Sequence, residues 1–279
     1  MKNGTLVCDS LLSLESIELT GVITNRLLCN GMNPSLKKDK EYLDKLFDSL
    51  CLDEDAMAGL EAMKDFLPNV PGEIFDRYQA IKKEIESIEG LENLIIGACG
   101  LSPLGLIFAE NKELRVYDTD LKNIVSYRKG LKLGGSNYHL GQLDLLDRRQ
   151  MQAFASSLCK GKTALVVEGL TFYLNDAQRE KLHNNFKTLS EHLGWDVDFV
   201  FDYFVSDRSA RERDTVKDEN NERWRNFAKL AGNVHDEQQC FFKTRNQVIG
   251  YLRKEGFIDM RASSYSGKDN AHTIFVGRF

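Results

Sequence analysis

The sequence predicts a doubly wound α/β fold built on a mostly parallel sheet of seven strands. Short apolar runs at 94–96, 164–167 and 197–201 have the length and composition of buried strands. Segments with helical spacing separate them, and strands that alternate with helices form a parallel sheet. The last two strand patterns, 257–264 and 272–276, are joined by only a short polar turn and must pair as a hairpin. We therefore expect an antiparallel strand at the C-terminal end of the sheet.

Two further regions accompany this predicted core. The first 90 residues contain two stretches in which apolar residues keep helical spacing, which predicts an N-terminal helical cap (1–90). Residues 206–239 are dense in Arg, Asp, Glu and Asn and poor in large aliphatic residues. This composition predicts a helical insertion that forms a lid over one end of the sheet; a pair of solvated surface helices explains it equally well. We expect one domain, with a Rossmann-like core over 91–279.

Composition narrows the classes of partner. The net charge is only −5 and the chain has no basic run, which argues against nucleic acid as the main partner. The six cysteines have no metal-ligand spacing and no Cys-x-x-Cys, so we expect reduced thiols and no metal site. No stretch approaches the roughly 20 apolar residues of a membrane span, and the N-terminus lacks the apolar run of a signal peptide. We expect a soluble cytoplasmic protein without membrane contact; its oligomeric state stays open.

Candidate ligand-binding residues follow the predicted strands, at the carboxyl edge where open α/β sheets bind ligands. A turn of small residues follows the first strand and lets a ligand approach the backbone: Gly97, Ala98, Cys99 and Gly100. Asp118 and Asp120 follow the second strand, where a carboxylate can accept hydrogen bonds from ribose hydroxyls. Both patterns also have plainer explanations, because a tight turn needs glycine in any case and acids at a strand end are often solvated.

Two more candidate groups follow the third and fourth strands. Asp144 can accept from an adenine amino group while Leu145 covers the ring. Glu168 and Gly169 come directly after the apolar pair Val166-Val167, where a carboxylate is costly to bury without a partner. A cationic ligand, such as a sulfonium with its ammonium, would supply that partner, and so would a nearby arginine.

Several of these motifs together resemble one protein family. The stretch from Glu168 to Leu174 (Glu-Gly-Leu-Thr-Phe-Tyr-Leu) resembles the Glu-x-x-x-x-Tyr-(Leu/Met) signature of the leucine carboxyl methyltransferases, which include the tetracenomycin-type polyketide O-methyltransferases. Residues 117–120 (Tyr-Asp-Thr-Asp) are similar to the family's Phe-Glu-Val-Asp motif, and residues 144–145 to its adenine-binding Asp-Leu pair. Arg77 lies in a stretch that resembles the one whose arginine holds the methionine carboxylate, and Arg26 in one similar to the N-terminal arm.

The resemblance implies S-adenosylmethionine as the cofactor and transfer of a methyl group to an oxygen. The acceptor most readily expected is a carboxylate of a small or polyketide-like acid, because a carboxylate is ionised at pH 7 and needs no general base. Such an enzyme works by aligning the reacting atoms and excluding water. The turn departs from the pattern of class I methyltransferases, since Ala98 and Ser102 stand where glycine is common. Asn25 also replaces a lysine of the family's N-terminal arm.

The remaining candidates concern the acceptor. Tyr173 and His139 are candidate catalytic groups that could act as a base or orient a less acidic hydroxyl, although a lone histidine is more often structural. Tyr173 is also a candidate for binding an acidic substrate, together with Arg26, Arg208 and Arg211. Two other classes of function stay open. An NAD-dependent oxidoreductase is disfavoured by the terminal hairpin and by the missing Gly-x-Gly-x-x-Gly; a non-catalytic cofactor-binding module is compatible with the altered glycine turn.

Overall fold

The computed structural model describes residues 37–47, 70–194, 196–205, 242, 244–263 and 272–279. The strands are β1 (Asn93–Gly97), β2 (Arg115–Asp120), β3 (Tyr138–Gln142), β4 (Thr163–Val167), β5 (Val197–Phe204), β6 (Ile258–Ala262) and β7 (His272–Arg278). The helices are α3 (Lys37–Phe47), α5 (Val70–Glu86), α6 (Leu104–Phe108), α7 (Lys122–Gly130), α8 (Arg148–Ser157), α9 (Asp176–Leu193) and α11 (Arg245–Lys254), with a short 3₁₀ helix, η2 (Thr171–Tyr173).

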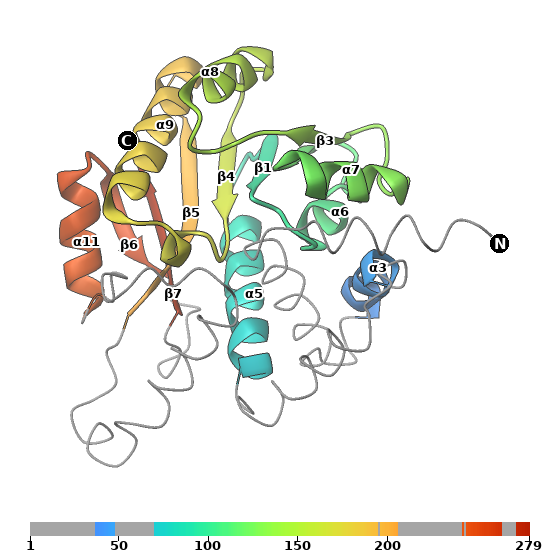
Figure 1. Cartoon of the computed structure of the whole chain (residues 1–279), viewed down its shortest axis with the longest axis horizontal. Coiled ribbons are helices and arrows are strands. Elements are labelled where there is room, and N and C mark those ends of the chain that lie inside the picture. The colour runs from blue at the N-terminus through green and yellow to red at the C-terminus, as the bar shows by residue number, and fades with distance from the viewer. Residues whose placement is uncertain (1–36, 48–69, 195, 206–241, 243, 264–271) are drawn as a thin grey trace.

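The strands form one sheet in the order β3-β2-β1-β4-β5-β7-β6. Strands β1 to β5 pair in parallel, and β7 lies antiparallel between β5 and β6. This arrangement confirms the predicted fold class. Helices α5, α6 and α7 lie on one face of the sheet and α8, α9 and α11 on the other (Figure 1). The chain leaves β1 and β4 toward opposite faces, so the strand order reverses between these two neighbours, which is where ligands bind in open α/β sheets.

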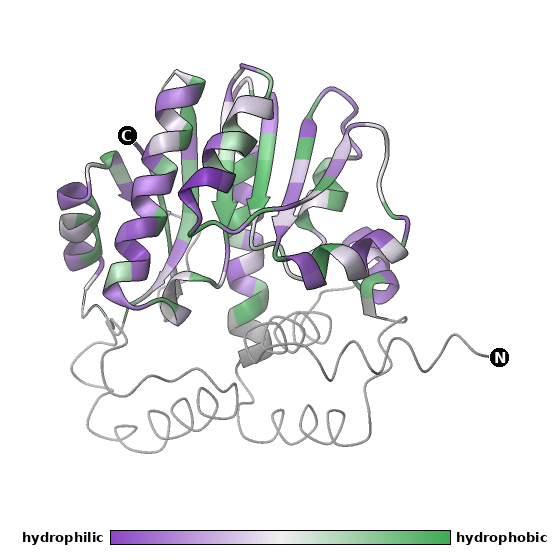
Figure 2. Ribbon diagram, turned by 45° about the horizontal axis from the view of Figure 1, so that its top comes forward, coloured by the Kyte–Doolittle hydropathy of each residue, from purple (hydrophilic) through white to green (hydrophobic). Residues whose placement is uncertain are grey.

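The alternation of side chains along the strands divides the core into two layers. Leu94 and Ile96 of β1 pack with α5 on one face, while Ile95 packs with the helices on the other. Both faces of the central strands are apolar, as a sheet covered on both sides requires, and the outer surfaces of the helices carry the polar residues (Figure 2).

Capping residues fix where the helices begin. Asn175 and Thr244 each form a capping box with the glutamine three residues later. Asp147 accepts hydrogen bonds from the amides of the first turn of α8. Strand β2 continues through Asp120, and α6 is a helix of only five residues.

The described part of the N-terminal helical cap is anchored to the core by buried polar contacts. Asp39 of α3 accepts hydrogen bonds from the Tyr78 hydroxyl (2.7 Å) and the Lys82 ammonium (2.8 Å), both on α5. Tyr127 of α7 donates to the Leu46 carbonyl oxygen (2.7 Å). The insertion at 206–239 lies outside the described residues. Of the helices that are described, none is both long and apolar enough to cross a membrane.

His183 is a buried titratable group in the core between α9 and β5. Its Nε2 lies 3.0 Å from the Tyr203 hydroxyl, and aromatic rings, including Phe257, surround it. Burial, with a smaller effect of Arg179, lowers the pKa of His183 from 6.5 to about 3. Between pH 6.5 and pH 3, His183 is therefore protonated in the unfolded chain but neutral in the folded protein. The free energy of unfolding falls as the pH is lowered through this range.

The substitution His183→Gln should remove this pH dependence while keeping a hydrogen-bonding partner for Tyr203. Between pH 7 and pH 5 the parent should lose about 2 kcal/mol of unfolding free energy more than the variant loses. Urea unfolding at a series of pH values measures this difference. His192→Gln, an exposed position on the same helix, is the matched control and should follow the parent. If the free energy of unfolding depended on pH in the same way in the parent and in His183→Gln, the lowered pKa of His183 would be contradicted.

Candidate active site

The carboxyl ends of β1, β2 and β4 lie side by side and bring the predicted site residues to one edge of the sheet. Gly97 is in register with Thr119 of β2 and with Val167 of β4. The turn after β1, the acids at the end of β2 and Glu168 after β4 therefore lie at the same edge of the sheet, as the sequence predicted.

The turn that follows β1 has an unusual backbone. Ala98 and Gly100 have φ angles of +50° and +49°, in the left-handed region that favours glycine. Cys99, between them, donates its amide to the Thr119 carbonyl oxygen (3.0 Å), and burial raises the pKa of its thiol well above the usual range. Cys99 thus uses both its amide and its side chain within the protein, which disfavours the ligand contact predicted for it.

Gly97 allows the loop after β3 to approach the turn. A Cβ atom at Gly97 would lie 3.0 Å from Cδ1 of Leu145 and 3.3 Å from Val167, so a larger residue would force the loop outward. Leu145 is only 4% exposed, and most of its surface already packs in the core. Asp144 is half-buried, and its Oδ1 accepts from the Leu146 amide (2.8 Å). Its other oxygen has no partner among the described residues and remains available to a donor.

Asp120 lies at the edge and contacts the turn directly. Its Oδ2 accepts from the Gly100 amide (2.6 Å) and its Oδ1 from the Leu121 amide (2.7 Å). Both oxygens of Asp120 thus accept from backbone amides of the protein. A carboxylate has about four acceptor positions, so these two contacts do not rule out a ribose, and that contact stays a prediction.

Asp118, two residues earlier, has a different position, which corrects the prediction made for it. Its side chain is 0% exposed, and its Oδ2 lies 2.5 Å from Nη2 of Arg128 and accepts from the Tyr138 hydroxyl (2.8 Å). A Cβ atom at Gly105 would lie 1.9 Å from its Oδ1, so α6 covers the carboxylate closely. Asp118 therefore has no surface to offer a ribose and forms a buried ion pair of the scaffold.

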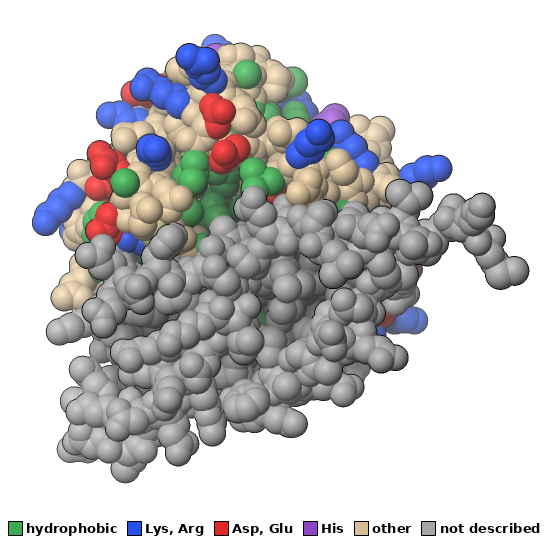
Figure 3. Space-filling model, in the orientation of Figure 1, with side chains coloured by type: hydrophobic (Ala, Val, Ile, Leu, Met, Phe, Trp, Pro, Cys, Tyr) green, Lys and Arg blue, Asp and Glu red, His purple; other side chains and the backbone are tan. Residues whose placement is uncertain are grey.

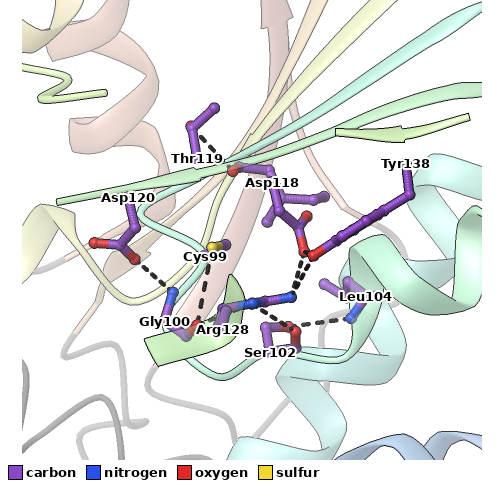
Figure 4. Close-up of polar contacts among 10 residues, drawn as sticks. Cys99, Gly100, Ser102, Leu104, Asp118, Thr119, Asp120, Arg128 and Tyr138 are labelled. Atoms are coloured by element: carbon purple, nitrogen blue, oxygen red, sulfur yellow. Dashed lines mark hydrogen bonds and ion pairs between the residues drawn. The ribbon is translucent and has the colours of Figure 1, made fainter. Parts of the chain in front are cut away.

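Arg128 of α7 is a residue of the site that the sequence did not reveal. Its Nη1 donates to the carbonyl oxygens of Gly100 (2.9 Å) and Ser102 (3.2 Å), and its Nη2 binds Asp118 (Figure 4). The available signal was the acid inside β2, because a buried carboxylate needs a cation. That signal does not say which of the following basic residues supplies it.

A second buried ion cluster joins α5, β4 and β5. Nε of Arg77 lies 2.9 Å from Oε1 of Glu168, and its Nη1 lies 3.5 Å from Oδ2 of Asp202. Asp202 also accepts from the Gly169 amide (2.8 Å). Arg77 is 4% exposed and contacts two acids of the protein itself, whereas the resemblance gave it a ligand carboxylate. Asp202, at the end of an apolar strand, is a further site residue that the sequence reading missed.

Glu168 is the most exposed member of this cluster: its side chain is 15% exposed, against 4% for Arg77 and 0% for Asp202. Oε2 of Glu168 makes no hydrogen bond or ion pair to any described residue, while Oε1 is held by Arg77. Burial raises the pKa of Glu168, Arg77 opposes this effect, and the nearby Asp202 adds to it. The carboxylate is therefore only partly compensated, and a positive charge beside Oε2 would stabilise it.

The two candidate catalytic residues, Tyr173 and His139, lie in different parts of the structure. Tyr173, in the 3₁₀ helix after Glu168, is half-buried and close enough to Arg77 to contribute to the raised pKa of that arginine. His139 is exposed and stacks on Tyr117, with ring centroids 4.9 Å apart. It precedes the end of β3 at Gln142 by three residues, or about 10 Å along the strand. This location corrects the catalytic role predicted for His139. Arg26, Arg208 and Arg211 lie outside the described residues.

The described surface carries charges of both signs. In the view of Figure 3, lysine and arginine side chains are interspersed with acidic ones instead of forming one basic area. This distribution agrees with the small net charge of −5.

Comparison with known proteins shows the fold. No protein-family model matches the sequence, and no curated protein matches it. A proposed methyltransferase from Thermobifida fusca YX superposes with a TM-score of 0.55 at 11% identity, covering 85% of this chain and 92% of that one. A DUF574 family protein from Streptomyces avermitilis MA-4680 superposes with a TM-score of 0.56 at 14% identity, covering 86% of this chain and 96% of that one. PigF with SAH superposes with a TM-score of 0.51 at 12% identity, covering 94% of this chain and 70% of that one. At these identities the likeness establishes the shared Rossmann-like α/β fold.

The backbone of Ala98 leads to a prediction about stability. Ala98→Gly should stabilise the protein by about 1 kcal/mol, because glycine adopts a φ of +50° without the steric cost that a Cβ atom imposes. Ala109→Gly, at a φ of −68°, should instead destabilise by about 0.5–1 kcal/mol. Urea unfolding of both variants tests the pair. A loss of stability in Ala98→Gly as large as that in Ala109→Gly would show that the turn is not strained.

Proposed function

We propose that the chain is an S-adenosylmethionine-dependent methyltransferase that binds its cofactor at the carboxyl edge of β1, β2 and β4. The observation that carries this proposal is Glu168: a largely buried carboxylate with one oxygen on Arg77 and the other without a partner among the described residues. A ligand that brings an ammonium and a sulfonium supplies the missing positive charge. The fold shared with the structures compared above supports the same conclusion.

The other residues at the edge fit the remaining parts of this cofactor. Asp120 would accept from the ribose hydroxyls, and the second oxygen of Asp144 from the adenine amino group. Gly100, whose φ is +49°, brings the backbone of the turn to this edge without a side chain. NAD fits less well for two reasons. Its diphosphate is anionic, and the carboxylate of Glu168 at the same edge would repel it. The helix whose N-terminus would have to hold that diphosphate, α6, has only five residues.

The bound cofactor supplies a methyl group on a positively charged sulfur, which an oxygen nucleophile can attack. We propose a carboxylate of a small acidic molecule as the acceptor. A carboxylate is ionised at pH 7, and the described edge holds Tyr173 but no histidine that could act as a base. The part of the protein is then to orient the two ligands and to exclude water. The cofactor should bind first, because Glu168 repels an anionic acceptor until a cation lies beside it.

Ligand-induced stabilisation tests the class of cofactor. S-adenosylhomocysteine at 100 times its dissociation constant should stabilise the protein by about 2.7 kcal/mol, seen as a rise in Tm. NAD at the same concentration should leave Tm unchanged. Stabilisation by NAD but not by S-adenosylhomocysteine would reverse the assignment, and binding without turnover over a broad panel of acids would favour a non-catalytic module.

Glu168→Gln tests the residue that carries the proposal. Affinity for S-adenosylmethionine should fall at least tenfold, because a hydrogen bond to a charged group contributes about 1.5–3 kcal/mol. The free protein should keep or gain stability, because burial, the main cause of the raised pKa of Glu168, disfavours the charge that the change removes, and Arg77 keeps its contact with Asp202. Calorimetric titration and urea unfolding measure the two quantities.

Glu84→Gln is the matched control for this experiment. Glu84 is also a buried glutamate paired with an arginine, Arg261, but it links α5 to β6 away from the edge. It should lose stability and keep its affinity for the cofactor. Equal affinity in the parent and Glu168→Gln would remove Glu168 from the site.

A further inference from the structure

One arginine, Arg128, binds two carbonyl oxygens of the turn that follows β1. Nη1 of Arg128 donates to the carbonyl oxygens of both Gly100 (2.9 Å) and Ser102 (3.2 Å). Its Nη2 donates to Oδ2 of Asp118 (2.5 Å) and to the Tyr138 hydroxyl (2.9 Å). One buried side chain on α7 thus joins the turn to β2 and β3 (Figure 4).

The partners of Arg128 fix its orientation. The Tyr138 hydroxyl accepts from Arg128 and donates to Asp118 (2.8 Å), which closes a triangle of three buried polar groups. A guanidinium carries donors on several sides of a rigid plane, so it can bind the acid and the turn at the same time. Gly105 leaves room for this triangle, because a Cβ atom there would collide with the Asp118 carboxylate.

The orientation of the Gly100 carbonyl decides where the Leu101 amide points, whereas Ser102 precedes Pro103, which has no amide hydrogen. In a trans peptide the carbonyl oxygen and the next amide hydrogen point in opposite directions. With the Gly100 carbonyl turned toward Arg128, the Leu101 amide points away from α7. The Gly100 amide is directed to Asp120, on the other side of the turn. The left-handed residues Ala98 and Gly100 persist only where the surroundings hold them, and Arg128 and Asp120 provide that restraint.

We propose that Arg128 is a positioning residue that holds the turn in the shape the cofactor binds, an inference that rests on the proposed function. Arg128 acts through the carbonyl oxygens of Gly100 and Ser102 and does not contact the ligand. Asp118 and Tyr138, which orient the guanidinium, belong to the same device. The acid of β2 that the sequence suggested as a ribose ligand therefore serves the cofactor indirectly, through the backbone of the turn.

The substitution Arg128→Lys separates this role from a general role in folding. A lysine still neutralises Asp118, but its single nitrogen cannot bind the acid and both carbonyl oxygens together. Amide hydrogen exchange over residues 98–104 of the free protein should accelerate at least tenfold. The dissociation constant for S-adenosylhomocysteine should rise about tenfold.

Arg261→Lys is the matched control, because Arg261 also pairs with a buried acid, Glu84, on a different part of the sheet. It should leave exchange over 98–104 and cofactor affinity as in the parent. If Arg128→Lys does not fold, Tyr138→Phe replaces it: this variant keeps the Arg128–Asp118 pair, loses the hydroxyl that orients it, and should shift both readouts in the same direction by a smaller factor.

The outcomes distinguish this proposal from the proposed function. Faster exchange in the turn together with weaker binding supports the role of Arg128. Unchanged exchange, or faster exchange with unchanged affinity, in a parent that binds S-adenosylhomocysteine overturns the role of Arg128 alone. A parent that does not bind S-adenosylhomocysteine overturns the proposed function, and with it the role of the turn in holding this cofactor.

Discussion

The structure depends on buried carboxylates at the carboxyl edge of the sheet, because a buried negative charge is stable only beside a positive group. The protein supplies that positive group in two ways. Asp118 has an arginine of its own, Arg128, and a tyrosine that completes the arrangement. Glu168 and Asp202 lie against the same arginine, Arg77, and Glu168 keeps one oxygen without a described partner. Asp118 likewise keeps one oxygen without a described partner, but that oxygen is buried under α6. The Glu168 side chain is 15% exposed, so only Glu168 leaves a place for a cationic ligand.

The two clusters also explain how distant parts of the chain define one site. Arg77 meets partners 91 and 125 residues later in the sequence and thereby fixes α5 against the ends of β4 and β5. Arg128 connects α7 to the turn after β1. Removing one partner of a buried ion pair leaves an uncompensated charge, so both clusters make the geometry of the edge sensitive to single substitutions. The shape of the edge thus depends on side chains of α5 and α7 as well as on the strands.

Much of the fold could be predicted from local patterns in the sequence. Apolar runs predicted the central strands, and the short polar turn predicted the terminal hairpin. These features depend on neighbours within a few residues, and the sequence displays such neighbours directly. The turn after β1 and the acids Asp120 and Glu168 were likewise found at the predicted edge.

The roles of individual side chains were harder to predict, because they depend on contacts between distant segments. Asp118 and Asp120 are two residues apart on one face of β2, and only the cover of α6 and α7 separates a buried ion pair from an edge residue. His139 precedes the carboxyl end of β3 and stacks on Tyr117, a placement that depends on the register of β2 and β3. Asp202 and Arg128 gave no local signal of the partners they meet.

A crystal structure of the protein with S-adenosylhomocysteine tests the central claim most directly. The account predicts the ligand at the carboxyl edge of β1, β2 and β4, with its ammonium within hydrogen-bond distance of Glu168. Its ribose hydroxyls should lie on Asp120 and its adenine amino group on Asp144, with Arg128 still bound to the carbonyls of Gly100 and Ser102. Density for the ligand elsewhere, such as the groove between α8 and α9 lined by Arg148, Lys181 and Lys187, would contradict the account.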